Sequence, residues 1–117
     1  MMIDRLVGRI AKLKNPIVAG LDPRLDLIPS FIRDEMIKEY GETPRAAAEA
    51  IFIFNRGIID GVCDIVPAVK PQIAFYEQYG AEGIAAYKKT VDYAREKNMI
   101  VVGDIKRGDI SSTAEAY

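Results

Sequence analysis

Histidine is absent from this sequence of 117 residues, and cysteine occurs once, at Cys63. Without histidine the chain has no Ser-His-Asp triad, no usual neutral-pH general base and none of the commonest metal ligand. One cysteine permits no internal disulfide and no thiolate zinc cluster, and we expect it to be a small buried apolar side chain. Any catalysis by this chain must therefore use carboxylates and lysines.

Net charge is also nearly absent, because 16 basic and 17 acidic residues leave a formal charge of −1. A nucleic-acid-binding domain usually carries a basic face, and a protein drawn to anionic lipids carries a polybasic patch. No apolar run approaches the roughly 20 residues that cross a bilayer, and the first residues lack the apolar centre of a signal peptide. We therefore expect a cytoplasmic protein without nucleic-acid or membrane partners.

Half of the residues are hydrophobic, and their spacing predicts both helices and strands. Apolar residues at helical spacing predict four helices, over 3–13, 30–40, 44–62 and 81–97. We expect Ser30 to cap the second helix and Thr43 to cap the third, with Pro44 at its first position. Glu49, Ala50, Phe54, Ile58 and Val62 are expected to lie on or beside one face of the third helix.

Three short apolar runs predict strands buried on both faces, over 17–21, 65–70 and 100–104. A further helix is expected to open at Ser111 or Ser112. Strands that alternate with helices and are apolar throughout indicate parallel pairing through right-handed crossovers. No internal repeat or flexible linker divides the chain, so we expect one continuous α/β domain over residues 1–117.

Charged residues follow or end each predicted strand. Asp22 follows the first, Lys70 ends the second, and Asp104 and Lys106 come with the third. The carboxyl ends of parallel strands face the same way, and active sites are built there in barrels and in open sheets. Two acids and two lysines are therefore expected on one rim.

The segment 104–109 concentrates this charge. Side chains alternate along a strand, so Asp104 and Lys106 point the same way, and Gly108 allows a turn that places Asp109 beside them. Opposite charges about 4 Å apart interact by ~4 kcal/mol at an effective dielectric near 20. Such neighbours hold Lys106 protonated, as a general acid that delivers a proton to a carbanion must be.

Each feature has an ordinary explanation when it is taken alone. The charged hexapeptide could be a solvated loop with surface ion pairs, and Asp22-Pro23 could be a simple turn. Lys70 could be a strand end that meets solvent. We expect the aromatic residues Phe75, Tyr76 and Tyr79 to pack in the core rather than stack on a ligand. The placement of the charges after three separate strands favours a site.

Three motifs occur in order along the chain: Gly-Leu-Asp-Pro over 20–23, Ala-Val-Lys-Pro-Gln-x-Ala-Phe-Tyr-Glu over 68–77, and Asp-x-Lys-Arg-Gly-Asp-Ile-x-Ser-Thr over 104–113. Together with Phe54-Asn55 they resemble the orotidine 5′-phosphate decarboxylase family, in particular its second bacterial subgroup, over nearly the whole chain. The Val-Lys-Pro-Gln and Lys-Arg-Gly-Asp-Ile segments are highly specific in combination. The Asp-x-Lys-x-x-Asp core alone is shared with related decarboxylases and synthases.

The resemblance implies a fold, a reaction and an assembly. The fold is a TIM-type (β/α)8 barrel, of which this chain holds only the first three strands and their helices. The reaction is the decarboxylation of orotidine 5′-monophosphate to uridine 5′-monophosphate in pyrimidine biosynthesis, with no metal and no organic cofactor. The partner it implies, besides the nucleotide substrate, is a second subunit, in a homodimer with shared active sites.

The same resemblance assigns catalytic roles. Lys106 is the proton donor to C6 of the pyrimidine, and Lys70, Asp104 and Asp109 complete a network of alternating charge. Loss of carbon dioxide leaves negative charge at C6, which a fixed ammonium stabilises as it develops.

Substrate-binding roles follow in the same way. Asp22 hydrogen-bonds the ribose, while Ile110 and Thr113 reach the substrate from the neighbouring subunit together with Asp109.

The length of the chain limits these expectations, since a closed barrel needs eight strands and typically about 250 residues. We therefore expect 117 residues to be an amino-terminal portion of such an enzyme, inactive alone. Two alternatives remain open. One is a related sugar-phosphate decarboxylase that uses magnesium, and the other is a catalytically dead half-barrel that serves as a binding or oligomerisation module.

Overall fold

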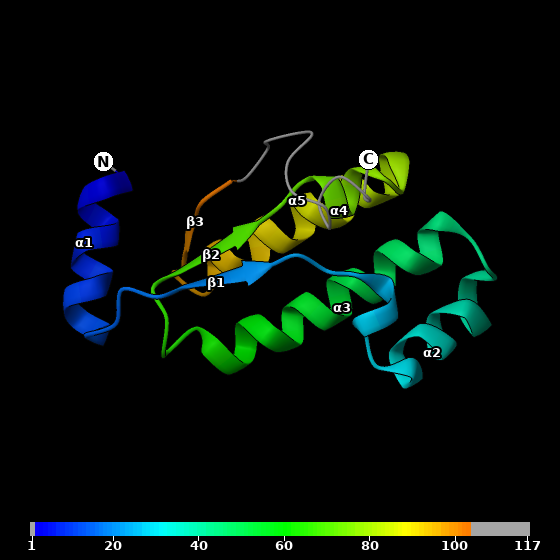
Figure 1. The fold of residues 1–117 in the computed structure, drawn as a ribbon, viewed down its shortest axis with the longest axis horizontal. Coiled ribbons are helices and arrows are strands. Elements are labelled where there is room, and N and C mark those ends of the chain that lie inside the picture. Colours follow the sequence, from blue (N-terminus) through cyan, green and yellow to red (C-terminus); the bar gives the residue numbers. More distant parts are fainter. Residues whose placement is uncertain (1, 104–117) are drawn as a thin grey trace.

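Three parallel strands form the centre of the molecule in the computed structural model, which describes residues 2–103 (Figure 1). They are β1 (Val18–Leu21), β2 (Ala68–Pro71) and β3 (Ile100–Val101), and their order in the sheet is β1-β2-β3. Both pairings are parallel, as the sequence predicts. The carboxyl ends of these strands therefore lie at the same edge of the molecule.

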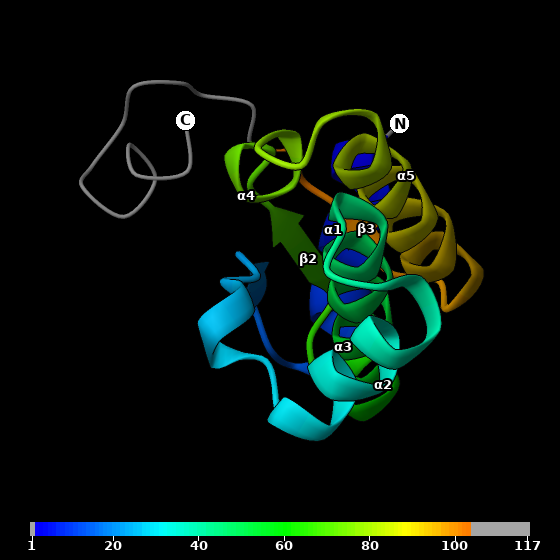
Figure 2. The same ribbon diagram turned by 90° about the vertical axis from the view of Figure 1, so that its right-hand side faces the viewer.

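Five α-helices and one short 3-10 helix surround the described strands: α1 (Met2–Leu13), η1 (Leu25–Leu27), α2 (Ser30–Tyr40), α3 (Pro44–Val62), α4 (Ala74–Glu77) and α5 (Gly80–Glu96). The long helices α3 and α5 pack against each other on the same side of the sheet (Figure 2). Helix α1 stands beside the amino ends of the strands, and α2 and α4 lie toward the opposite end (Figure 1). All helices that were expected within the described residues are present.

Part of the core lies between the sheet and its two long helices. One cluster of buried side chains joins both layers, from Leu21, Ile59, Val66, Val69, Ala94 and Met99. Removing such a side chain from water contributes about 1.5–3 kcal/mol, so this cluster holds α3 and α5 onto the strands. Val66 and Met99 immediately precede or lie close before β2 and β3, so this cluster extends to the amino ends of the strands.

Local signals explain how α2 ends and α3 begins. The C-cap of α2 is Gly41, whose φ of 74° suits glycine. Thr43 caps α3 as expected, since its side chain accepts a hydrogen bond from the Ala46 amide at 3.2 Å, and Pro44 follows at the first helical position. The expectation that Ser30 caps α2 is wrong. Ser30 is the first helical residue, and Pro29 precedes it as the cap without a side-chain bond.

Of the residues expected on or beside one face of α3, Ala50 is buried, and Phe54, Ile58 and Val62 pack against the core clusters. Glu49, Phe54, Ile58 and Val62 are only partly buried, whereas the fully buried stripe runs through Ala48, Ile51, Asn55 and Ile59. Ala46 and Ala50 pack against Met36 of α2. Asn55 is tolerated in the stripe because its Nδ2 donates two hydrogen bonds, while its Oδ1 has no partner among the described residues.

The second strand starts later than predicted. It begins at Ala68, because the chain after α3 makes another helical turn in which the amides of Ile65 and Val66 bond to the Val62 carbonyl. The short helices η1 and α4 were not predicted, since three or four residues carry no helical period. The predicted end of the third strand at residue 104 and the helix predicted to open at 111 or 112 lie outside the described residues.

Candidate active site

Asp22 and Lys70 share one face of the sheet at the carboxyl ends of β1 and β2. Gly20 is paired with Lys70 across the two strands, and paired residues direct their side chains to the same face. A Cβ built on Gly20 would lie 3.7 Å from Oδ2 of Asp22. The carboxylate of Asp22 therefore lies over the same face as Lys70, on the neighbouring strand, and both residues are exposed there.

The third strand arrives beside this pair. Val101 is paired with Val69, and the amide of Val102 donates to the Val69 carbonyl at 2.9 Å, which carries the ladder past the end of β3. Gly103 is the last described residue of this strand end. The remaining predicted site residues, Asp104, Lys106, Asp109, Ile110 and Thr113, lie outside the described residues.

A buried hydrogen-bond network supports the rim from below. The hydroxyl of Tyr76 in α4 donates to the carbonyl of Leu21, the last residue of β1, at 3.0 Å. Asn55 in α3 donates through Nδ2 to that hydroxyl at 2.9 Å and to Oγ1 of Thr90 in α5 at 3.3 Å. Thr90 in turn donates to the Ala86 carbonyl at 2.8 Å. Three helices are thus tied to the strand end that leads into Asp22.

Burial keeps the Tyr76 hydroxyl protonated. Desolvation raises the pKa of Tyr76 well above its ordinary value, the hydrogen bond from Asn55 opposes this, and the negative charge of Asp22 adds to the rise. The ring of Tyr87 packs edge-on against Tyr76, with centroids 5.2 Å apart and planes at 84°. A Cβ on Gly103 would lie 3.4 Å from the Tyr87 hydroxyl. The two rings therefore stand behind the ends of the first and third strands.

Gln72 shapes the turn after β2. It is 3% exposed, and its Oε1 accepts a hydrogen bond from the Ala74 amide at 3.1 Å. This bond caps the segment that leads into α4 and so places Tyr76. The expectation that Phe75, Tyr76 and Tyr79 pack in the core is confirmed, since the first two are buried and the third packs against them.

Sequence reasoning missed the polar role of Tyr76 and of its partners. Asn55 sits on an apolar helix face, which was the available signal, because a buried amide requires partners. Those partners lie 21 and 35 residues away along the chain. No local pattern could identify them.

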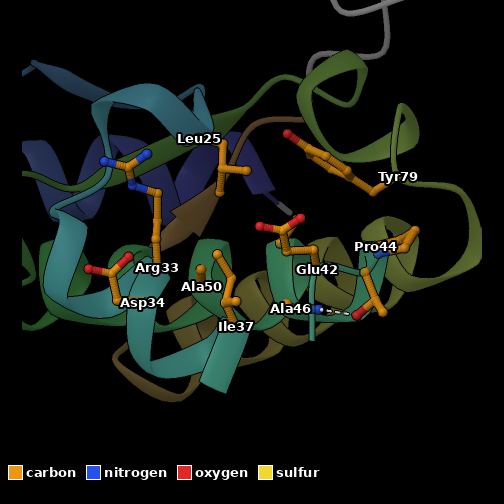
Figure 3. A pocket seen from close by; sticks show the side chains of 11 residues that line it. Leu25, Arg33, Asp34, Ile37, Glu42, Pro44, Ala46, Ala50 and Tyr79 are labelled. Atoms are coloured by element: carbon orange, nitrogen blue, oxygen red, sulfur yellow. Dashed lines mark hydrogen bonds between the residues drawn. The ribbon is translucent and has the colours of Figure 1, made fainter. Parts of the chain in front are cut away.

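A separate cavity of about 440 Å³ lies between η1, α2 and the start of α3, with Tyr79 at one side (Figure 3). Its walls are mainly apolar, with Arg33, Asp34 and Glu42 among them. Neither Asp22 nor Lys70 lines it. Burial raises the pKa of Tyr79, and the negative charge of Asp26 adds to this. Because neither Asp22 nor Lys70 lines the cavity, it is distinct from the rim that carries the charged residues.

Two further observations concern the described residues alone. Between Met2 and Gly103, no group of three or more histidine, cysteine or acidic side chains is placed to hold a metal ion. None of the helices in that range is long and apolar enough to cross a membrane.

The sequence model described as "Orotidine 5'-phosphate decarboxylase / HUMPS family" matches residues 42–117. Among curated proteins, the orotidine 5′-phosphate decarboxylase of Petrotoga mobilis is 45% identical over the whole chain, and that of Clostridium tetani is 46% identical. The chain spans 37% and 38% of the lengths of these two proteins.

Solved structures give the same result. A putative orotidine-monophosphate decarboxylase from Toxoplasma gondii matches with a TM-score of 0.69 and 30% identity, over 97% of this chain and 34% of that one. A putative orotidine 5′-phosphate decarboxylase from Streptomyces avermitilis matches with a TM-score of 0.65 and 30% identity, over 96% of this chain and 35% of that one. The three described strands and their helices are therefore part of an α/β barrel of the TIM type, as the sequence predicts.

Proposed function

Since the match over residues 42–117 shows that this chain belongs to the orotidine 5′-phosphate decarboxylase / HUMPS family, we propose that it forms part of an enzyme that converts orotidine 5′-monophosphate to uridine 5′-monophosphate. Curated relatives that are 45% and 46% identical over the whole chain carry the name of that activity. The substrate class is accordingly a pyrimidine nucleotide.

The observation that carries the proposal is the shared face of Asp22 and Lys70. An acid and a lysine stand at the carboxyl ends of adjacent parallel strands. The third strand reaches the same end at Gly103, immediately before the segment 104–109 in the sequence. Active sites of such barrels are built from residues at these ends. The described end of the third strand supports the proposal that the family motif joins Asp22 and Lys70 on this rim.

The proposed chemistry uses lysine and carboxylate groups. Lys106 delivers a proton to C6 after carbon dioxide leaves, and Lys70, Asp104 and Asp109 fix the charge around it. An ammonium already in position stabilises negative charge as it develops and needs no reorganisation during the reaction. No histidine is needed for this scheme, which fits a sequence that has none.

Substrate binding and assembly complete the proposal. Asp22 hydrogen-bonds the ribose, and Ile110 and Thr113 contact the substrate from a second subunit together with Asp109. The proposal includes a homodimer and a cytoplasmic location, both of which rest on the family resemblance.

The chain alone is expected to be inactive. It spans 37% of the length of its relative from Petrotoga mobilis, and phosphate sites in such barrels frequently use loops after the seventh and eighth strands. Measurable turnover by the pure 117-residue chain would contradict this part of the proposal.

The test of the function is a chimera in which these 117 residues replace the matching segment of the Petrotoga mobilis relative. We expect the chimera to decarboxylate orotidine 5′-monophosphate. Lys106→Ala should lower its kcat by far more than tenfold, where tenfold corresponds to about 1.4 kcal/mol of activation barrier. Lys88→Ala is the matched control, because Lys88 is exposed and pairs with Asp92 on the surface of α5.

The same chimera separates the competing functions. A sugar-phosphate decarboxylase that depends on magnesium would lose activity when a chelator is added, whereas the proposed reaction would not. Calorimetry with uridine 5′-monophosphate tests for a catalytically dead scaffold. Such a scaffold would show no binding that is lost when Lys70 or Lys106 is substituted. A folded chimera without activity on orotidine 5′-monophosphate contradicts the proposal.

A further inference from the structure

Tyr76 is a buried, ionisable residue for which the proposed chemistry has no use. It is fully buried, and its ring packs among Ile51, Phe75 and Ala86. Packing explains the ring and leaves the hydroxyl unexplained. That hydroxyl reaches the main chain of β1 at Leu21, 55 residues earlier in the sequence.

The direction of the hydrogen bonds around this hydroxyl is fixed. Asn55 donates to Tyr76 through Nδ2, so the hydroxyl oxygen acts as the acceptor on that side. The single phenolic proton is then available for the carbonyl of Leu21. The hydroxyl of Thr90 accepts a hydrogen bond from the same amide and donates one to the carbonyl of Ala86. These two hydrogen bonds hold the side chain of Asn55 in place.

The Leu21 carbonyl belongs to the peptide bond that leads into Asp22. On the other side of Asp22, the ring of Pro23 is buried and restricts its own φ angle. Asp22 is thus held between two constrained points, with an exposed carboxylate on the rim. A peptide plane that could rotate at Leu21 would carry this carboxylate away from the face that it shares with Lys70.

We propose that Tyr76, oriented by Asn55, is a positioning residue that fixes the Leu21–Asp22 peptide and thereby the carboxylate that binds the sugar of the nucleotide. The inference rests on the proposed function for the role of Asp22. Tyr87 supports the arrangement by its edge-on contact with the Tyr76 ring. Tyr76 does not touch the substrate and acts only through Asp22.

A double-mutant cycle in the chimera tests this role. Tyr76→Phe keeps the ring and removes the hydroxyl, and we expect it to lower kcat/KM about tenfold. In an Asp22→Ala background the same change should lower kcat/KM less than twofold, because the group that it positions is gone. A purely structural role would give the same fold-loss in both backgrounds, and that result, or no loss at all, overturns the proposal.

Tyr93→Phe is the matched control. It also removes one hydrogen-bonded hydroxyl, the one that donates to the carboxylate of Asp60 on the exposed side of α3 and α5. We expect it to leave kcat/KM within twofold of the unmodified chimera. A tenfold loss there would show that any lost tyrosine hydroxyl impairs the enzyme, and it would overturn the assignment to Tyr76.

A second measurement separates this inference from the proposed function. Labelling the 117-residue chain with carbonyl ¹³C leucine and ¹⁵N aspartate selects two peptide bonds, Leu21–Asp22 and Leu25–Asp26. Tyr76→Phe should move the Leu21 carbonyl signal upfield and leave the Leu25 signal in place as an internal control. If neither signal moves, or both move equally, the inference fails. If the chimera is inactive but the Leu21 signal of the 117-residue chain still responds to Tyr76→Phe, the proposed function alone is refuted.

Discussion

At the scale of single residues, Tyr76 gives the molecule a dependence on alkaline pH. Its pKa in the folded protein is raised by burial, above a value near 10 in the unfolded chain. A raised pKa means that the stabilising contribution is complete below about pH 10 and is lost as the pH rises toward the folded value. Above pH 10 we expect the free energy of unfolding to fall by up to roughly 1.4 kcal/mol per pH unit from this group.

Urea unfolding at pH 9 and at pH 11 measures this loss of unfolding free energy. In Tyr76→Phe the free energy of unfolding should fall less between the two pH values, by the amount that Tyr76 contributes. Tyr93→Phe is again the control. The pKa of Tyr93 is raised mainly by its hydrogen bond to Asp60, and its hydroxyl is solvent-exposed. Because solvent screens this interaction, Tyr93 contributes less than Tyr76 to the pH dependence of the free energy of unfolding. Parallel declines in the wild type and in Tyr76→Phe would contradict the prediction.

The residues that mark the site differ in how far the sequence could place them. Asp22 and Lys70 were predicted to share a rim because each stands at the end of an apolar run, and this needs only the parallel order of the strands. Asn55 and Tyr76 look like helix packing in the sequence. Their function in the fold depends on contacts between three helices and a strand, which appear only when the chain is folded.

At the scale of elements, the contact between α4 and α5 depends on one glycine. A Cβ on Gly83 would lie 1.7 Å from the carbonyl oxygen of Tyr76, a distance that no rotamer change can relieve. Alanine raises helix propensity by about 1 kcal/mol over glycine. We nevertheless expect Gly83→Ala to destabilise the fold by about 1–3 kcal/mol net, because α4 or α5 must shift.

Gly57→Ala is the matched control for this change. Gly57 also lies inside a long helix, α3, but it is exposed, and nothing lies within 4 Å of a Cβ built there. Alanine should stabilise the protein at that position by roughly 0.5–1 kcal/mol. Denaturant midpoints of the two variants should move in opposite directions, and a stabilising Gly83→Ala would show that the contact is not tight.

The elements that were predicted well have strong local signals, and those that were missed have none. Thr43-Pro44 fixes the start of α3 through a cap and a restrained φ. The cap of α2 was misplaced because a serine near a helix start can be either the cap or the first helical residue. The short helix α4 follows from Gln72 and its bond to the Ala74 amide, which no periodicity reveals.

At the scale of the whole molecule, large apolar side chains are exposed around α1 and the amino ends of the strands: Ile3, Val7, Ile17 and Ile65, each at least 57% exposed. Exposed apolar groups mark association surfaces where they gather into one patch, and these four residues lie on α1 and in the segments that lead into β1 and β2. We therefore expect the 117-residue chain to self-associate as its concentration rises. Sedimentation velocity measures this, and the double variant Ile3→Lys with Val7→Lys should weaken it.

Ala11→Lys is the control for added charge, since Ala11 is also exposed on α1. It should leave the association unchanged, because it removes little apolar surface. Equal sedimentation of the two lysine variants would show that net charge, and not the apolar face of α1, controls association.

The architecture was the most predictable property of the chain. Alternating strands and helices of apolar character determine a parallel α/β arrangement, and the family resemblance makes it part of a barrel. The site was predictable in outline only. Two of its charged residues are placed by the described strands, whereas the buried support behind them combines residues from α3, α4 and α5 that a linear pattern cannot connect.

The strand order β1-β2-β3 is also the order of synthesis. Within residues 2–103, β2 pairs with β1 and β3 pairs with β2, so none of these three strands must wait for a later segment to be inserted between neighbours. Domains assemble amino end first as ribosomes release the chain at about 5–20 residues per second. The sheet can therefore grow by one strand and one helix at a time on the ribosome, and Asp22 can be anchored as soon as Tyr76 has emerged.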